Sequence, residues 1–131
     1  FCSEGPLTSP RVQALLPGVS RLLDRAAALG IGRVVLAQDA HPPDSPEFAA
    51  FPPHCLSGTR EAETVPEIAA RPDFGGMTVI PKGSLNVGLE PSFAAFVQAN
   101  PLLHTWIVVG DCTDLCVHAA AMHLRMLANT Q

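Results

Sequence analysis

The sequence has few charged side chains, no cluster of basic residues and no long uninterrupted apolar run. Charged residues make up 15% and apolar residues 47% of the 131 positions, a balance that argues against disorder and for one packed core. With a net charge of −4 and no basic cluster, binding to nucleic acid or to an anionic membrane is not expected. No apolar run reaches about 18 residues, so we expect no membrane-spanning helix.

The sequence also lacks the charged and apolar pattern of a secretory leader. Its four cysteines are Cys2, Cys55, Cys112 and Cys116. Without a leader they are interpreted as reduced thiols of a cytoplasmic protein. The chain begins at Phe1 without Met and stops within an expected helix at Gln131. We therefore interpret residues 1–131 as a single, incomplete domain.

Alternating helical and strand patterns predict an α/β fold. Helical spacing of apolar residues occurs at 11–29, 91–98 and from 116 onward, and short apolar β-branched runs occur at 33–38, 77–80 and 106–109. Such alternation predicts a parallel sheet with right-handed crossovers. The strand at 33–38 is continuously apolar, which is typical of a strand buried on both faces.

The stretch from Trp106 to His118 carries the first chemical signal. An apolar strand is broken by Gly110 and Asp111, and a helix follows, with Thr113 and Asp114 expected to cap its start. Cys116 then lies in the first helical turn at the carboxyl end of a strand, where ligands bind in open α/β sheets. A helix N-terminus lowers a thiol pKa and favours the reactive thiolate. On position alone, however, a small buried thiol is the commoner reading.

Two further groups follow the other strands. In the long loop at 39–64, Asp39 and His41 leave the strand with side chains on the same side, and two histidines and two carboxylates within 16 residues can make a site for Zn²⁺, Fe²⁺ or Mn²⁺. Taken alone, a solvated polar loop is the commoner explanation. Lys82 ends the strand at 77–80, where a surface lysine is the ordinary explanation, although an ammonium beside a thiolate would stabilise that thiolate. The topology brings these groups and Cys116 to one edge of the sheet.

Four segments together resemble the isochorismatase-like cysteine hydrolases. They are Gln38–His41, Phe51–Thr59, Lys82–Gly83 and Gly110–Val117. Within that superfamily, the aromatic-Pro-Pro-His-Cys block with its following Gly-Thr is most similar to the nicotinamidases. The resemblance implies a three-layer α/β/α fold with a parallel, Rossmann-like sheet, whose first strand and C-terminal part would lie outside this chain.

The resemblance also implies an Asp-Lys-Cys catalytic triad. Cys116 would be the nucleophile and Lys82 would hold its thiolate, while the Asp would lie a few residues before Phe1. The backbone N–H groups of Cys112 and Cys116 would form the oxyanion hole, reached through a cis peptide at Asp111–Cys112. Cys112 departs from the smaller residue that nicotinamidases often carry there.

A metal and a ring-binding pair complete the implied site. The implied metal ligands are Asp39, His41, Glu47 and His54. The metal, which would be Zn, Fe or Mn, would orient the substrate. Phe1 and Phe51 would enclose its flat ring.

The implied reaction is hydrolysis of nicotinamide to nicotinate and ammonia through a cysteine thioester, a step of pyridine nucleotide salvage in NAD metabolism. The partner would be a small-molecule amide, and homo-oligomer formation stays open. A different isochorismatase-like hydrolase, such as an isochorismatase or a carbamoyl-amide hydrolase, is one alternative, although those relatives typically lack the metal set. A catalytically inactive metal- or ligand-binding fragment is the other, because the Asp would lie upstream.

Overall fold

The structure is a computed structural model and describes residues 3–130. These residues form two compact units, divided between Gly83 and Ser84. The first unit contains α1 (Pro10–Gln13), α2 (Leu16–Ala28), β1 (Val35–Asp39), η1 (Pro46–Ala49), η2 (Arg60–Ala62), α3 (Pro66–Ala69), η3 (Phe74–Gly76) and β2 (Thr78–Lys82). The second contains η4 (Val87–Leu89), α4 (Pro91–Ala99), η5 (Thr113–Val117) and α5 (His118–Ala128). No helix among the described residues is long and apolar enough to cross a membrane.

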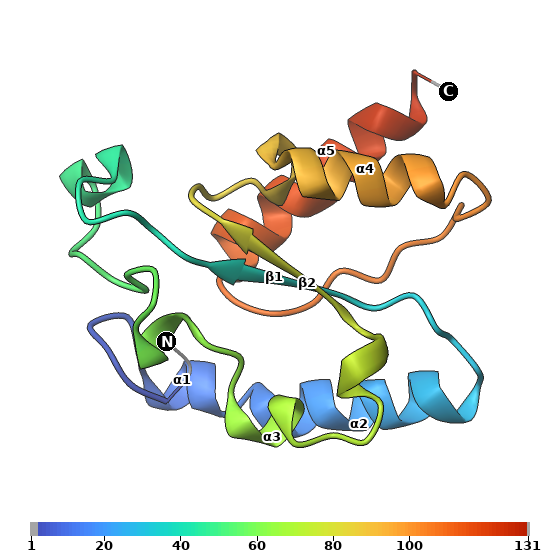
Figure 1. The fold of residues 1–131 in the computed structure, drawn as a ribbon, viewed down its shortest axis with the longest axis horizontal. Helices are drawn as coiled ribbons and strands as arrows, with labels where there is room; N and C mark the ends of the chain where they lie inside the picture. Colours follow the sequence, from blue (N-terminus) through green and yellow to red (C-terminus); the bar gives the residue numbers. More distant parts are fainter. Residues whose placement is uncertain (1–2, 131) are drawn as a thin grey trace. The chain divides into compact units, whose positions relative to one another are not determined.

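The two strands of the first unit lie side by side and run parallel, as predicted (Figure 1). Their register runs from Val35 opposite Thr78 to Asp39 opposite Lys82. Ile80 is fully buried, but Val79 on the opposite face is 43% exposed. In β1, Ala37 is exposed and Val35 and Leu36 are half-buried, so the expectation that the strand at 33–38 is buried on both faces is wrong within residues 3–130.

Proline and glycine set the helix boundaries in the first unit. The Ser9 hydroxyl accepts the N–H of Val12 at 3.2 Å, and the following proline opens α1. Pro17 lies in the first turn of α2, so α1 and α2 are separate helices, as proline geometry requires. Gly30 follows α2 with φ +69°, a conformation that favours glycine. The short helix α3 packs against α2 (Figure 1).

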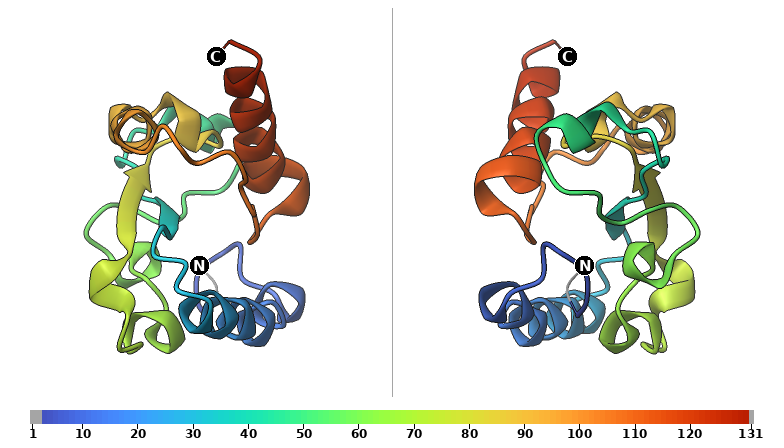
Figure 2. Two further views of the ribbon diagram at one scale, coloured as in Figure 1. Left: turned by 90° about the vertical axis from the view of Figure 1, so that its right-hand side faces the viewer. Right: turned by 90° about the vertical axis from the view of Figure 1, so that its left-hand side faces the viewer.

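Aromatic residues form the core of the second unit. Phe93 on α4 is 4% exposed, and its ring lies 6.2 Å from those of both Trp106 and His123. Figure 2 shows α4 nearly end-on, with α5 running across that direction. His123, which lies off the apolar stripe of its helix in the sequence, thus contributes to packing.

The run 106–109 forms no strand within residues 3–130, contrary to the prediction. Its exposure nevertheless alternates as in a strand with one covered face. Trp106 and Val108 are half-buried, whereas Ile107 and Val109 are 70% and 50% exposed. β-Branched composition favours an extended backbone, but a strand also needs a hydrogen-bonded neighbour, and the described residues supply none.

Candidate functional site

Asp39 and Lys82 lie at the carboxyl ends of β1 and β2, directly opposite each other in the register. Their side chains are 8% and 4% exposed, and the Lys82 ammonium donates a hydrogen bond to Asp39 Oδ1. A buried charge is costly unless it is paired. Each residue therefore offsets the desolvation of the other, and the pair anchors this edge of the sheet.

A short backbone bridge brings the two histidines of the loop together. His41 forms an isolated parallel bridge with Leu56. The His41 N–H donates to the Cys55 carbonyl, and the Ser57 N–H donates to the His41 carbonyl, both at 2.9 Å. Cys55 has φ +45°, an uncommon conformation for a residue other than glycine. This pairing places residue 54 beside residue 41 although a long loop separates them.

The result is a cluster of buried ligand atoms. One ligand atom each of Asp39, His41 and His54 lies within 4.8 Å of the others. Glu47, from η1, adds an oxygen 3.8 Å from Nε2 of both histidines. The structure thus brings together all four side chains that the resemblance implies as metal ligands, although their role as ligands stays a prediction.

The hydrogen bonds of the two imidazoles leave the Nε2 atoms for the cluster. His54 Nδ1 lies 2.8 Å from the Pro52 carbonyl oxygen, so it carries the proton and Nε2 keeps its lone pair. His41 is fully buried, and its Nε2 has no hydrogen-bond partner among residues 3–130. A buried nitrogen is rarely left unsatisfied. Two imidazole nitrogens with carboxylates suit a divalent transition metal, so this donor set fits one.

Two residues near the cluster were not predicted from the sequence. Ser45 is 5% exposed, and its Oγ lies 3.4 Å from His41 Nδ1. The ring of Phe48 packs edge-on against both imidazoles, at 5.5 Å from His41 and 5.6 Å from His54. A signal for Ser45 was present, because Ser45-Pro46 repeats the Ser9-Pro10 pattern that marks the start of a helix.

Phe51 and Phe1 are the implied ring-binding residues. The Phe51 ring is half-buried and lies 6.4 Å from the His54 ring, so it borders the cluster. Phe1 lies outside the described residues. Enclosure of a substrate ring by the two therefore stays a prediction.

Cys116 lies in the second unit, in the π-helical turn η5 that leads into α5. The Val117 N–H donates to the Cys112 carbonyl at 3.2 Å, and the peptide bond between Asp111 and Cys112 is cis, as the resemblance implies. The predicted capping is wrong, because Cys112 is the N-cap residue and no side chain caps the turn. Thr113 lies inside this π-helical turn, and α5 begins only at His118. π-Turns of this kind occur frequently at functional sites.

The thiols differ in their surroundings. Burial raises the pKa of the Cys55 thiol to about 11. Burial, together with the charge of Asp111, raises the pKa of the Cys112 thiol to about 11. Neither thiol is therefore suited to act as a nucleophile near neutral pH. The nucleophilic role of Cys116, its pairing with Lys82 and the oxyanion hole at Cys112 and Cys116 stay predictions.

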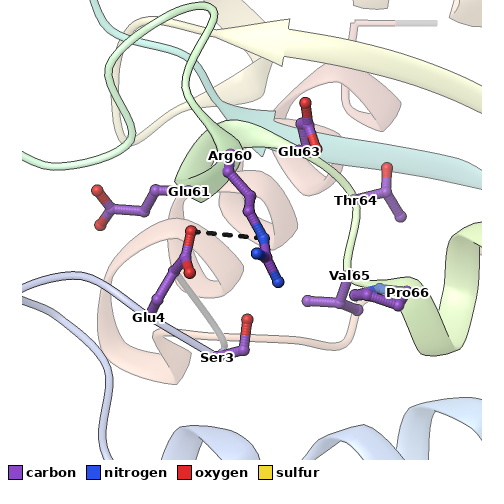
Figure 3. Close-up of a pocket in the computed structure, with 8 residues that line it drawn as sticks. All are labelled: Ser3, Glu4, Arg60, Glu61, Glu63, Thr64, Val65 and Pro66. Carbon is purple, nitrogen blue, oxygen red and sulfur yellow. Dashed lines mark ion pairs between the residues drawn. The ribbon is translucent and has the colours of Figure 1, made fainter.

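A small pocket lies elsewhere in the first unit, and none of the predicted site residues lines it. It has a volume of about 50 Å³ and is bordered by Ser3, Glu4, Arg60, Glu61, Glu63, Thr64, Val65 and Pro66 (Figure 3). Arg60 points toward Glu4, and their charged atoms are 3.9 Å apart. Both side chains are exposed, so this ion pair contributes little.

Residues 1–127 match the family model described as the isochorismatase domain. The chain belongs to the isochorismatase domain family. Nicotinamidase 1 of Arabidopsis thaliana is 37% identical over 86 residues, which cover 60% of this chain and 34% of that protein. The chain therefore spans about a third of the length of this curated relative.

Solved structures show the fold. N-Carbamoylsarcosine amidase from Thermoplasma acidophilum has a TM-score of 0.81 at 25% identity, covering 92% of this chain and 67% of the other. Pyrazinamidase/nicotinamidase from Streptococcus mutans has a TM-score of 0.79 at 20% identity, covering 94% and 72%. The chain thus has the isochorismatase-like α/β fold, with a parallel pair of strands and helices within residues 3–130.

Proposed function

We propose that this protein hydrolyses the amide of nicotinamide to nicotinate and ammonia. The observation that carries the proposal is the buried cluster of Asp39, His41 and His54, joined by Glu47, in a chain of the isochorismatase domain family. When bound there, a divalent Zn, Fe or Mn ion would supply a Lewis acid that fixes the orientation of the pyridine ring. The similarity to Nicotinamidase 1 supports the same substrate.

The chemical step is assigned to Cys116. Its thiolate attacks the amide carbon, the C–N bond breaks, and ammonia leaves with the proton taken from the thiol. Water then cleaves the thioester to release nicotinate and regenerate the thiol. The N–H groups of Cys112 and Cys116 are proposed to hold the oxyanion. Lys82 is proposed to hold the thiolate electrostatically, and an Asp upstream of Phe1 is proposed to transfer the proton.

A different small amide is the second candidate. The structural similarity to N-carbamoylsarcosine amidase, at 25% identity, favours a carbamoyl-amide substrate handled by the same cysteine chemistry. The metal-ligand cluster favours nicotinamide, because imidazole-type ring nitrogens suit these transition metals and a carbamoyl amide has no ring nitrogen. A third candidate is a metal-binding role without turnover, in which case the experiment described next would show no ammonia release.

The test is ammonia release by the full-length protein. We expect release from nicotinamide and little from N-carbamoylsarcosine. Cys116→Ser should abolish release, because a serine hydroxyl is not ionised at neutral pH and needs a stronger base. His118→Ala, which changes an exposed neighbour in the same segment, should retain activity. Release that persists in Cys116→Ser contradicts the mechanism, and preference for the carbamoyl amide contradicts the substrate.

A further inference from the structure

We propose that Ser45 is a positioning residue that orients His41 and Glu47 together toward the metal, an inference that rests on the metal site of the proposed function. Its side chain is buried beside the cluster. Oγ lies 3.4 Å from His41 Nδ1 and accepts the backbone N–H of Glu47 at 3.3 Å. One hydroxyl therefore contacts two of the four side chains in the cluster.

The hydrogen-bonding capacity of a serine hydroxyl matches this arrangement. The oxygen has two acceptor lone pairs. If His41 binds a metal through Nε2, its Nδ1 carries the proton and donates to Ser45 Oγ, and the second lone pair takes the Glu47 N–H. The fully buried ring then has a partner on one nitrogen while the other faces the carboxylates, with Asp39 Oδ1 and Glu47 Oε1 each 3.8 Å away.

The second histidine shows the same arrangement with a different partner. His54 Nδ1 is held by the backbone carbonyl of Pro52 at 2.8 Å. Both imidazoles thus have an oxygen behind them and Nε2 toward the cluster. Metal-binding histidines in proteins usually have such a partner, which fixes ring orientation and tautomer. For His41 this partner is a side chain, so a substitution can remove it.

Ser45 also determines where Glu47 lies. It precedes Pro46, and its hydroxyl caps the single turn of η1 that carries the glutamate. Loss of the hydroxyl therefore removes the restraint on the His41 ring and loosens the turn that presents Glu47. Ser45→Ala therefore removes both the contact to His41 and the cap of the turn. Glycine is tolerated at a cap position, so it removes mainly the contact to His41.

The experiment measures metal affinity in the full-length protein, by competition between the protein and a chelator for Zn²⁺. We expect Ser45→Ala and Ser45→Gly to bind about 10- to 100-fold more weakly than wild type. Ser45→Thr, which keeps the hydroxyl, should restore most of the affinity. The control is Ser57→Ala in the same loop, where the side chain is exposed and no change is expected.

The Co²⁺ absorption spectrum separates orientation from folding. Its bands report coordination geometry, so a reoriented His41 should change them in Ser45→Ala, whereas Ser57→Ala should leave them as in wild type. If Ser45→Ala does not fold, Ser45→Gly supports the same comparison. If Ser45→Ala and Ser45→Gly keep the metal affinity and the spectrum of wild type, the proposed role of Ser45 is wrong, but the proposal of a metal site is not affected. Absence of metal binding in wild type overturns both proposals.

Discussion

The reactivity of individual thiols provides a test at the scale of single residues. Cys112 and Cys116 lie in the same turn, but the pKa of the Cys112 thiol is raised to about 11 by burial and by Asp111. Its thiolate is therefore scarce at neutral pH and accumulates only as the pH rises toward that value. We predict that limiting iodoacetamide at pH 7 labels Cys116 before Cys112, and that labelling of Cys112 increases steeply in alkaline buffer.

Peptide mapping by mass spectrometry measures this order in full-length protein kept reduced. The internal control is Cys55, which is 1% exposed and should stay unlabelled at pH 7 while the protein is folded. Nicotinamide should slow the labelling of Cys116 alone, because the proposed substrate covers it. Faster labelling of Cys112 than of Cys116 at neutral pH contradicts the assignment of the nucleophile.

At the scale of elements, the contact between η4 and α5 depends on a glycine. A Cβ at Gly88 would overlap the ring of His123, while the backbone of Gly88 is not left-handed. We predict that Gly88→Ala lowers the free energy of unfolding by about 1–3 kcal/mol, measured in urea, through overpacking alone.

Two variants isolate the steric cause of this loss. His123→Ala removes the obstructing ring, so Gly88→Ala should cost much less in that background. Gly75→Ala is the matched control, since nothing lies within 4 Å of a Cβ at that position. Equal costs of Gly88→Ala in both backgrounds would exclude His123 as the cause.

The ion pairs of Arg71 link α2 to the segment after α3. Its guanidinium donates to Asp24 at 2.7 Å and to both oxygens of Asp73 at 2.9 and 3.1 Å. Hydrogen bonding from Arg71 lowers the pKa of Asp73 below its ordinary value of 3.8. Stabilisation by Asp73 is therefore present above that ordinary value and is lost as the pH falls through the lower folded-state pKa.

We accordingly predict that wild type is more stable than Asp73→Asn at neutral pH and that this advantage disappears in acid. Thermal melts from pH 7 down to pH 2 should show two curves that converge at the acid end. Asp44→Asn, at an exposed loop residue with no ion pair among those found within residues 3–130, is the control and should track wild type. A constant difference between the curves at all pH values contradicts the proposed ionic origin.

At the scale of the whole molecule, metal binding should be linked to stability. An ion that binds the folded protein alone raises the free energy of unfolding, by about 2.7 kcal/mol at one hundred times the dissociation constant. We predict that Zn²⁺ raises the melting temperature of full-length wild type and that a chelator reverses the change. His54→Ala should lose this response, and elemental analysis after dialysis should find less metal in it. Equal metal content in the two proteins contradicts the site.

Local sequence signals predicted most elements of the fold. The helix boundaries seen in the structure at Ser9-Pro10, Pro17 and Gly30 have local causes. Proline fixes its own φ and lacks an N–H, and glycine tolerates a positive φ, whatever the distant contacts. The parallel pairing of β1 and β2 also followed, since both strands flank helices in the expected alternation. The expectations that failed are the strand at 106–109, the start of the last helix and the burial of the strand at 33–38. Each of these depends on neighbours in space that composition does not specify.

For the candidate site, the sequence by itself determined the chemistry available: which carboxylates, imidazoles, ammonium and thiols follow the predicted strands. Tertiary structure alone decided which of these groups meet. The bridge between His41 and Leu56 brings His54 to the cluster, and the register of the two strands sets Asp39 against Lys82. Ser45 is buried with its hydroxyl beside His41 Nδ1, a contact that its place in a loop sequence does not indicate. The physical reason is that a residue's type sets what it can bind, whereas its partners depend on backbone pairing between segments far apart in the chain.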